Sequence, residues 1–292
     1  QIGLLGLGNM GNGMALRLVQ GGHDVIGADL DPACRDRADG VGARTVESAQ
    51  QLVAALSAPR VVWVMLPPGE ATESALSELA GLLEAGDLVV DGGNSHFEDA
   101  PRRATLLGSR GVSFVDVGVS GGRWGWRNGY GLMIGATPAD LGRIEPALST
   151  LCSPEGYFRV GDVGAGHLTK AIHNAIQYGV MQAYAEGFAL LRAHTEVDTL
   201  AAMSAWQGGS SIRSWLLEQT VDALRAAPDL SEFSARVPDS GMGRWTASEA
   251  IRLGIPTPVL SAGLQTRFAS RSDDLPNRLL VAARARIGGK KS

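Results

Sequence analysis

A glycine-rich turn between a short apolar run and a helical segment constrains the fold of this chain more than any other feature. The apolar run covers residues 2–7 and leads into Gly6-Leu7-Gly8-Asn9-Met10-Gly11. A helical pattern follows from about Met10 to Gln20 and stops at two glycines. A strand, a G-x-G-x-x-G turn and a helix in this order form the dinucleotide-binding fingerprint. The alternative is a glycine-rich turn with a purely structural role.

The turn offers the backbone that a dinucleotide pyrophosphate needs. The first glycine permits the tight turn, the second lets the backbone approach the phosphates, and the third lets the helix pack on the strand. The free N–H groups and the positive dipole end of the helix then face the phosphates. We predict that the cofactor is bound by the residues of this turn, Gly6, Gly8, Asn9, Met10 and Gly11.

Asp29 ends the second predicted strand and bears on the choice of cofactor. A carboxylate at this place accepts hydrogen bonds from both ribose hydroxyls of NAD and repels the extra 2′-phosphate of NADP. Leu30 and Asp31 come next, so no arginine follows directly to hold that phosphate. Arg35 and Arg37 lie further along, where the neighbouring carboxylates oppose such a role. We predict NAD rather than NADP as the cofactor.

Apolar runs separated by helical segments make up the first half of the chain. They cover residues 2–7, 23–29, 60–66, 87–91, 112–117 and 132–135. The runs are continuous rather than alternating, which indicates strands buried on both faces and a parallel, right-handed α/β sheet. After about residue 161 strand-like runs stop and helical periodicity dominates. We predict an α/β chain: a doubly wound Rossmann sheet in an NAD-binding domain, residues 1–161, and an all-helical substrate and dimerisation domain, residues 162–292.

Composition argues against several classes of function. The 292 residues are 45% apolar, enough for a sizeable core, and their net charge of −4 with mixed signs does not suit a nucleic-acid partner. No apolar run is long enough for a membrane span, and no signal sequence is recognisable before the first strand. Cys34 and Cys152 lack metal or redox spacing, which indicates reduced thiols, no metal site and a cytoplasmic protein.

Two polar loops follow buried strands and are candidates for the reaction centre. Asp91-Gly92-Gly93-Asn94-Ser95 follows one strand, and Ser120-Gly121-Gly122 follows another. Ligands of open α/β sheets bind beyond the carboxyl ends of the strands, so we expect both loops to face the nicotinamide. Glycines permit close approach of the backbone, while Asn94 and Ser120 supply hydrogen bonds. Each loop taken alone is equally compatible with a simple turn.

A polar stripe on the helix predicted after residue 164 is the sharpest catalytic signal. Its members are spaced i, i+3, i+4, i+7 and i+8 on one helix face: Lys170, His173, Asn174, Gln177 and Tyr178. A solvated stripe is the alternative, but this mixture of side chains is unusual for one. Burial in a closed cleft would lower the pKa of the lysine toward neutrality, so that its amine accepts a proton from a substrate hydroxyl. The neighbouring polar side chains would orient hydroxyls and a carboxylate.

These motifs together resemble the short form of the 6-phosphogluconate dehydrogenase family, within the 3-hydroxyacid dehydrogenase superfamily. The matching segments span nearly the whole chain: GLGNMG (6–11), MLPPG (65–69), DGGNS (91–95), GVSGG (118–122), KAIHNAIQYGVMQAYAEG (170–187) and GRWT (243–246). The resemblance implies oxidation of a sugar acid at C3, decarboxylation of the β-keto acid to an enediol, and protonation to a ketopentose phosphate. The implied substrate is 6-phosphogluconate or an analogue, and the products include CO2 and NADH.

The resemblance also implies roles by position. Lys170 would be the general base, with Asn174 and Gln177 at catalytic positions. Further cofactor contacts would come from Leu66, Pro67 and Asn94. The substrate would be held by Asn94, Ser120, Gly121, Gly122, His173, Asn174, Tyr178, Arg267 and Arg284. Bidentate arginines suit phosphate and carboxylate. A homodimer or a dimer of dimers is implied, in which the tail that carries Arg284 completes the partner's site.

Departures from the family pattern cluster around the substrate. Gln177 stands where the family has a glutamate acid, and an amide donates no titrating proton, so the last protonation lacks its usual agent. Met242 replaces a glutamate of the short form, and Ser240 and Met242 correspond roughly to a phosphate-binding lysine and threonine of the long form. Lys290 replaces a histidine of the tail. These departures indicate a divergent member.

Three functions stay open at this point. The first is a decarboxylating 6-phosphogluconate dehydrogenase that acts on 6-phosphogluconate or an analogue. The second is a non-decarboxylating 3-hydroxyacid dehydrogenase, which Gln177 favours. The third is an inactive nucleotide-binding scaffold, against which Lys170 argues. Imine reductases share the architecture, but their proton donor usually occupies the lysine position, so Lys170 argues against them as well.

Overall fold

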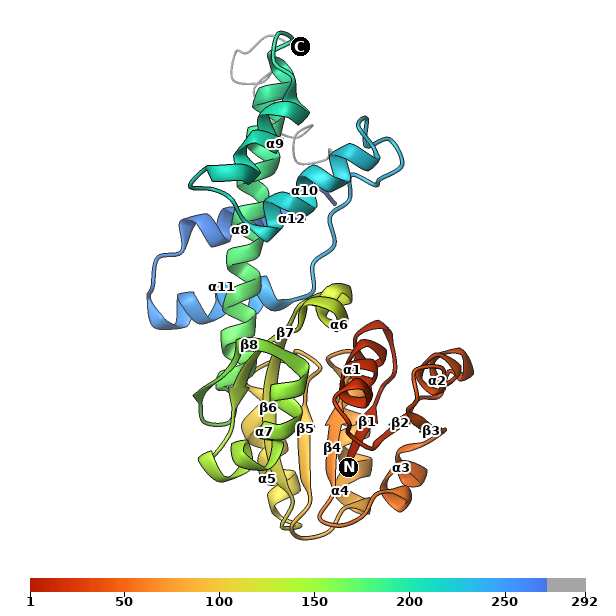
Figure 1. Cartoon of the computed structure of the whole chain (residues 1–292). Helices are drawn as coiled ribbons and strands as arrows, with labels where there is room; N and C mark the ends of the chain where they lie inside the picture. The colour runs from red at the N-terminus through yellow and green to blue at the C-terminus, as the bar shows by residue number, and fades with distance from the viewer. Residues whose placement is uncertain (272–292) are drawn as a thin grey trace. The chain divides into compact units, whose positions relative to one another are not determined.

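The computed structural model describes residues 1–271, apart from the side chain of Arg123 (Figure 1). The chain divides into two compact units, Gln1–His173 and the residues from Asn174 onward. Helix α8 (Ala165–Ala193) begins in the first unit and continues into the second. The domain boundary expected after residue 161 stays a prediction.

The first unit contains one eight-stranded sheet. Its strands are β1 (Ile2–Leu5), β2 (Val25–Ala28), β3 (Arg44–Val46), β4 (Val61–Val64), β5 (Leu88–Asp91), β6 (Ser113–Ser120), β7 (Tyr130–Gly135) and β8 (Cys152–Gly161). Their order across the sheet is β3-β2-β1-β4-β5-β6-β7-β8, and the first six pair in parallel. The order 3-2-1-4-5-6 is that of a doubly wound dinucleotide-binding sheet. The predicted Rossmann sheet is therefore confirmed.

The prediction of a wholly parallel sheet is wrong at β7, which runs antiparallel to β6. Only the short turn formed by η1 (Gly122–Trp124) and α6 (Gly125–Asn128) joins these two strands. A parallel pair needs a crossover of a dozen or more residues, so a connection this short reverses the chain. β8 was not predicted because Pro154 and Gly156 interrupt its apolar residues, as an edge strand allows.

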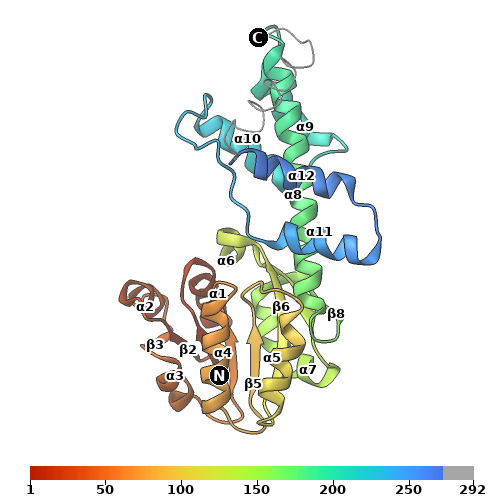
Figure 2. The same ribbon diagram turned by 180° about the vertical axis from the view of Figure 1, so that it is seen from behind.

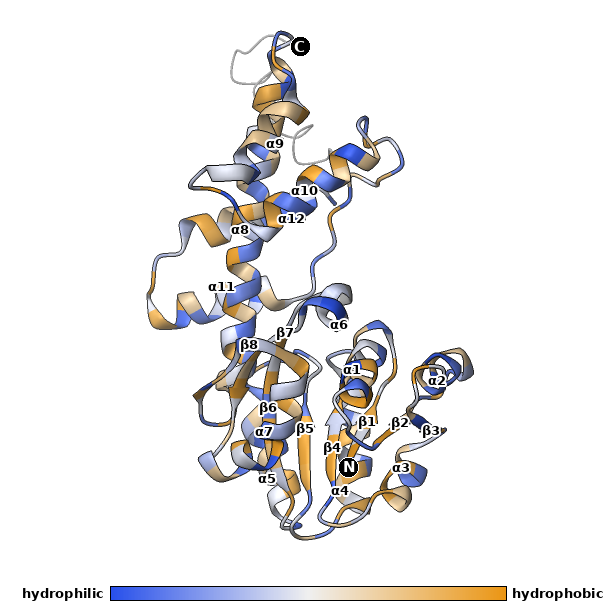
Figure 3. Ribbon diagram, in the orientation of Figure 1, coloured by the Kyte–Doolittle hydropathy of each residue, from blue (hydrophilic) through white to orange (hydrophobic). Residues whose placement is uncertain are grey.

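Helices cover both faces of the sheet. The first face carries α1 (Asn9–Gln20) and α7 (Pro138–Leu151), and the opposite face carries α3 (Ala49–Ala55), α4 (Glu70–Leu82) and α5 (Asp99–Gly108), as Figures 1 and 2 show from the two sides. The short helix α2 (Pro32–Asp39) follows β2. Figure 3 shows hydrophobic residues concentrated on the central strands β4 and β5, which lie between these helix layers. Burial on both faces explains why the strands are continuous apolar runs.

The second unit is helical throughout its described part, as predicted. Besides α8 it contains α9 (Thr199–Gly209), α10 (Trp215–Ala226), α11 (Met242–Leu253) and α12 (Pro258–Ala269). Asp198 and Ser214 cap α9 and α10 by accepting hydrogen bonds from backbone N–H groups of the first turn. A small core of Met203, Leu217, Val221 and Leu224 joins these helices. No helix within residues 1–271 is long and apolar enough to cross a membrane.

Candidate functional site

The glycine turn between β1 and α1 is shaped by close backbone contacts. Gly6 has a φ of 99°, and a Cβ there would lie 2.6 Å from the Met65 carbonyl oxygen. A Cβ on Gly11 would clash with the Gly6 carbonyl oxygen. Gly8 is different, because a Cβ on it would meet nothing within 4 Å. The turn therefore leaves open space in front of Gly8, at the start of α1, where a pyrophosphate would approach the backbone.

A cavity of about 490 Å³ opens beside this turn. Gly6, Asp29 and Leu66, three of the predicted cofactor residues, line it together with Leu30 and Glu47. Glu78 lines it as well, and none of its lining residues is basic. Its volume and position, next to the turn, fit the adenosine half of a dinucleotide. Three carboxylates in its wall disfavour an additional phosphate group.

Asp29 links the turn to the end of β2. Its carboxylate accepts hydrogen bonds from the backbone N–H of Leu7, at 2.7 Å, and of Asp31, at 2.9 Å. Arg35 donates to the Asp29 carbonyl oxygen at 2.8 Å and pairs with Glu47 at 3.2 Å. Arg35 is therefore engaged along the wall of the cavity, where neighbouring carboxylates oppose its use as a phosphate clamp.

Lys170 lies in the second turn of α8 and is buried, with only 5% of its surface exposed. Helix and strand approach closely there, since a Cβ on Gly118 of β6 would lie 2.5 Å from the Lys170 Cβ. Burial lowers the pKa of the Lys170 ammonium to about 8. At a pKa of about 8, roughly a tenth of this amine is neutral at pH 7, far more than for an ordinary lysine, so it can accept a proton.

A chain of polar contacts leads from Lys170 to the end of β6. Lys170 Nζ lies 3.4 Å from Nδ1 of His173, and His173 Nε2 lies 3.4 Å from Ser120 Oγ. His173 is exposed, whereas Lys170 is not. The structure thus brings together three predicted site residues from α8 and the end of β6, and these contacts link the amine to Ser120 through His173.

The other predicted loop residues shape the carboxyl edge of the sheet. Asn94 uses its amide on the backbone of Val119, donating at 3.1 Å and accepting at 2.8 Å, which ties the loop after β5 to β6. One amide hydrogen and one lone pair of Asn94 remain for a ligand. Gly121 and Gly122 have φ values of 124° and 50°, and a Cβ on Gly122 would point into open space. Pro67 is exposed just after β4, and its carbonyl accepts from Thr72.

In the second unit, predicted substrate residues form a cluster rich in arginine. The hydroxyl of Tyr178 lies 3.0 Å from Ser240 Oγ, and the Arg267 guanidinium stacks on its ring at 3.6 Å. Arg244 and Arg271 pair with the buried Asp239, at 3.0 and 3.7 Å. Three guanidinium groups against one carboxylate leave a positive balance, which suits an anionic group of a substrate. Arg284 lies outside the described residues.

Asn174 and Gln177 also belong to the second unit, and both contact thioethers. The Asn174 amide lies 2.8 Å from Met242 Sδ, and the Gln177 amide lies 3.8 Å from Met181 Sδ. Gln177 lines a mostly apolar hollow of about 440 Å³ between α8 and α10. No carboxyl group is among the residues that line this hollow, so within the described part of the chain it offers no substitute for the missing glutamate.

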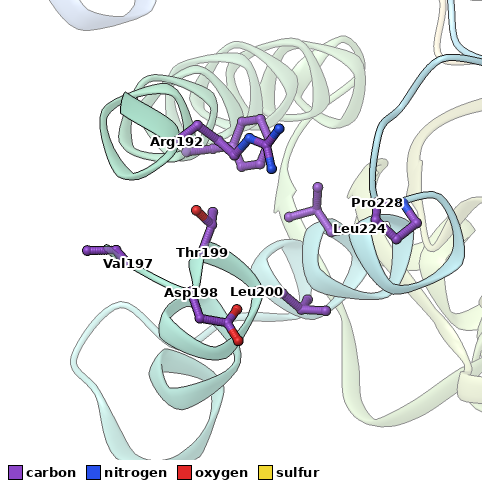
Figure 4. Close-up of a pocket in the computed structure, with 8 residues that line it drawn as sticks. Arg192, Val197, Asp198, Thr199, Leu200, Leu224 and Pro228 are labelled. Carbon is purple, nitrogen blue, oxygen red and sulfur yellow. The ribbon is translucent and has the colours of Figure 1, made fainter. Parts of the chain in front are cut away.

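Two other hollows contain no part of the buried lysine site. One of about 230 Å³ lies in the second unit, where Arg192, Thr199 and Leu224 line it (Figure 4). None of its lining residues is a predicted site residue. The other, of about 440 Å³, lies in the first unit, and Asn9 and Trp126 line it. Within residues 1–271 no group of three or more His, Cys, Asp or Glu side chains is arranged to hold a metal ion.

Two features of the site were missed from the sequence. The first is a network of four ionisable residues that are at most 1% exposed, behind the loops: Asp91, Arg103, Asp116 and His167. Two of them, Asp91 and Asp116, are single acidic residues within apolar strands, and this was the signal that could have found the network. The second is that Lys170 is the only lysine among residues 1–271, where arginine supplies every other long basic side chain. Arginine stays protonated, so lysine alone of the two suits a base.

Two family profiles together cover most of the chain. Residues 1–161 match the NAD binding domain of 6-phosphogluconate dehydrogenase. Residues 166–286 match the C-terminal domain of 6-phosphogluconate dehydrogenase.

Relatives of two lengths match this sequence. The chain is 37% identical over 291 residues to an NAD(+)-dependent, decarboxylating 6-phosphogluconate dehydrogenase of Haloferax volcanii, over 99% of this chain and 96% of that protein. It is 32% identical over 286 residues to an NAD(+)-dependent, decarboxylating 6-phosphogluconate dehydrogenase of Bacillus subtilis, over 92% of this chain but 61% of that protein. The chain thus corresponds to nearly all of the first relative and to part of the second.

Solved structures show the same fold. A Plasmodium falciparum 6-phosphogluconate dehydrogenase, determined with NADP+ and with 6-phosphogluconate, matches with a TM-score of 0.85 and 25% identity, over 100% of this chain and 65% of that one. A Mycobacterium tuberculosis 3-hydroxyisobutyrate dehydrogenase matches with a TM-score of 0.74 and 26% identity, over 92% and 93% of the two chains. A Streptomyces aurantiacus imine reductase, at 19% identity and a TM-score of 0.61, shares the fold alone.

Replacing Gly8 by alanine separates the binding role of the turn from its folding role. The new methyl group enters open space, so Gly8→Ala should change the free energy of unfolding by less than about 0.5 kcal/mol. It should weaken NAD binding at least about tenfold, because it blocks approach to the backbone. Urea unfolding and fluorescence titration with NADH measure the two effects. Gly11→Ala is the matched control and should lower stability; unchanged NADH affinity in Gly8→Ala would contradict the assignment.

Proposed function

The chain belongs to the 6-phosphogluconate dehydrogenase family, and we propose that it oxidises a phosphorylated sugar acid at C3 with NAD and decarboxylates the product. The observation that carries this proposal is the buried amine of Lys170. This amine contacts His173, whose ring in turn contacts Ser120 at the end of β6. In this proposal residues 1–161 bind NAD, and residues 162–292 hold the substrate and a second subunit.

The acidic cavity beside the glycine turn supports NAD as the cofactor. Asp29, Glu47 and Glu78 line it, and Arg35 is engaged with backbone and Glu47. A 2′-phosphate would enter a wall of negative charge, whereas ribose hydroxyls would find acceptors there. The Haloferax and Bacillus relatives are named NAD(+)-dependent, while the Plasmodium enzyme was solved with NADP+.

The arginine cluster of the second unit supports a phosphorylated substrate. Arg267 stacks on Tyr178, whose hydroxyl contacts Ser240, so two donors lie close to a fixed guanidinium. The Plasmodium relative was solved with 6-phosphogluconate as its substrate. We take 6-phosphogluconate or an analogue as the substrate class, because Met242 and Ser240 differ from the family pattern at this cluster.

In the proposed reaction Lys170 moves protons twice. Bound NAD would accept a hydride from C3 of the substrate. The neutral amine of Lys170 would take the proton of the C3 hydroxyl, which leaves a 3-keto acid. The C1–C2 bond would then break, so that CO2 leaves and the electron pair of this bond forms the enediol. In the same step the ammonium of Lys170 would return its proton to the C3 oxygen. His173 and Ser120 would hold the amine and the substrate hydroxyls in line.

The last step, protonation of the enediol at carbon, is where this chain departs from its family. Gln177 cannot donate the proton, so Tyr178 or water would have to, more slowly. This observation supports a second candidate, a 3-hydroxyacid dehydrogenase that stops at the keto acid. The fold likeness to a 3-hydroxyisobutyrate dehydrogenase is compatible with that candidate.

Exposed apolar side chains on the second unit support a homodimer. Met181 of α8 and Trp215 of α10 are 41% and 46% exposed and border the same apolar hollow. Burial of such a surface by a second copy of the chain would stabilise the pair through the hydrophobic effect. A dimer of dimers is the larger assembly consistent with this proposal.

A substrate screen with the Lys170→Ala variant tests the proposed function. The wild type should form NADH from 6-phosphogluconate or a related sugar acid, with one CO2 released for each NADH. Lys170→Ala should lower kcat at least about a thousandfold, because no neutral base remains, while the Kd of NAD changes less than about twofold. NADH absorbance and trapped CO2 are measured together, with gluconate and 3-hydroxyisobutyrate in the panel.

Lys170→Arg is the matched control for that loss. It keeps the positive charge and much of the volume but cannot give up its proton, so it should be as inactive as Lys170→Ala. Substantial activity in either variant would remove Lys170 from the role of base. A wild type that forms no NADH from any member of the panel would favour the scaffold over the enzyme.

Gln177→Glu tests whether the missing acid limits decarboxylation. If the wild type releases CO2, restoring a carboxyl group at this position should speed ketopentose formation about tenfold or more, since general acids contribute factors of that size. Gln219→Glu adds the same charge to the same hollow and should not speed the reaction. An unchanged rate in Gln177→Glu would mean that another group already donates the proton, and NADH without CO2 in the wild type would favour the second candidate.

A further inference from the structure

We propose that His167 is a positioning residue for Lys170: it holds the first turn of α8 against the sheet through a buried pair of carboxylates, Asp91 and Asp116. The inference rests on the proposed function only in taking Lys170 as the base. His167 itself touches neither the cavity nor the Lys170 amine in the contacts described above. Its effect would pass through the helix that carries both residues.

The first part of the evidence is the contact between His167 and the end of β5. His167 Nε2 lies 3.1 Å from Asp91 Oδ2, and both side chains are fully buried. Asp91 also accepts from Arg103, at 2.6 Å, and from the Gly93 N–H, at 2.9 Å. Asp91 therefore connects α8 to the loop that carries Asn94, at the carboxyl edge where a nicotinamide would lie.

The second part is the cap that Asp116 places on α8. This carboxylate, in the middle of β6, accepts from the backbone N–H of Gly164 at 2.6 Å and of His167 at 2.7 Å. Both donors belong to the start of the helix, where N–H groups have no intrahelical partner. A negative charge there also favours the helix dipole. His167 thus contacts β5 through its ring and is hydrogen-bonded to β6 through its backbone N–H.

The third part is the lack of space around this turn. A Cβ on Gly166 would lie 2.5 Å from the Asp116 carbonyl oxygen and 2.6 Å from that of Met133. A Cβ on Gly118 would meet the Lys170 Cβ. The helix cannot approach more closely, and any outward movement opens the contact that keeps water from Lys170. The position of Lys170 therefore depends on what holds the turn inward.

Two buried carboxylates, Asp91 and Asp116, meet the start of α8. Arg103 brings one positive charge to Asp91, and it shares this charge with Glu73 at 2.8 Å and with Asp99 at 3.6 Å. Burial by itself would raise the pKa of Asp91, yet His167, Arg103 and a backbone N–H bring it down to about 2. Burial raises the pKa of Asp116, which His167 and the two N–H groups only partly offset.

Removal of the imidazole ring should loosen the turn. Asp116, whose pKa burial already raises, would then take up a proton more readily and cap the helix less strongly. Water would reach Lys170 as the turn moves outward. Because burial is the cause of its lowered pKa, the Lys170 pKa should rise from about 8 toward its ordinary value of 10.5.

The test compares His167→Gln with the wild type in an assay that needs no substrate. Reductive methylation with ¹³C-formaldehyde labels the amines, and the chemical shift of the Lys170 methyl groups is followed against pH. Only Lys290 and Lys291 share its chemistry apart from the chain N-terminus, and Lys170→Arg identifies its signal. The midpoint should rise by at least about one pH unit in His167→Gln. A folded variant with the wild-type midpoint would overturn the proposal.

Kinetics supply the second measurement. His167→Gln should lower kcat about 10- to 100-fold, as a small displacement of a base does, with the KM and the Kd of NAD within about twofold. A merely destabilising change would lower the amount of active enzyme without moving the Lys170 midpoint. His23→Gln, whose ring contacts Thr150 at 2.9 Å, is the matched control and should change neither quantity.

Asp116→Asn is the second variant, and it decides the matter if His167→Gln does not fold. It keeps an oxygen for one backbone N–H but removes the charge, so the Lys170 midpoint should again rise. An unchanged midpoint in folded Asp116→Asn would overturn the proposal. If the wild type turns over no substrate at all, the proposed function fails, while the titration still decides whether His167 positions Lys170.

Discussion

The close approach of helix α8 to strand β6 is the constraint on which the rest of the site depends. Gly118 leaves room for the Lys170 Cβ, and Gly166 leaves room for the backbone of β6 and β7. This approach excludes water from the amine, and burial is the cause that lowers its pKa. His173 then contacts the amine, and Ser120 at the end of β6 contacts the other ring nitrogen of His173. Tight packing of the helix on the strand thereby lowers the pKa of the Lys170 amine.

The cofactor half of the site depends on a different use of glycine. Gly6 and Gly11 are required by the backbone itself, whereas Gly8 leaves space that only a ligand would fill. Asp29 both closes the turn, by accepting from the Leu7 N–H, and lines the adjoining cavity. The same carboxylate thus serves the local fold and, in the proposed function, would favour ribose hydroxyls over a phosphate. A dinucleotide bound there would bring its nicotinamide ring to the ends of β5 and β6, near Asn94 and Ser120.

The sequence predicted well what depends on local patterns. The G-x-G-x-x-G turn, the buried strands and the helix that carries Lys170 were recognisable because each involves neighbouring residues. The direction of β7 was not, because it depends on the length of a connection whose residues resemble a loop. The buried contact between His167 and Asp91 was missed because it joins residues far apart in the chain. Nor could the spacing of the polar stripe show that Lys170 is buried while His173 is exposed, since that difference comes from β6.

The dependence of kcat/KM on pH, measured with unmodified protein and a sugar acid that it oxidises, tests the central claim most directly. A neutral, buried amine as the base requires activity to rise with pH through a midpoint near 8 and then to level off. A midpoint near 6.5, the ordinary pKa of histidine, would assign the proton to His173 instead. Activity that continues to rise beyond about pH 10 would mean that Lys170 is solvated in the working enzyme, and the account would be wrong.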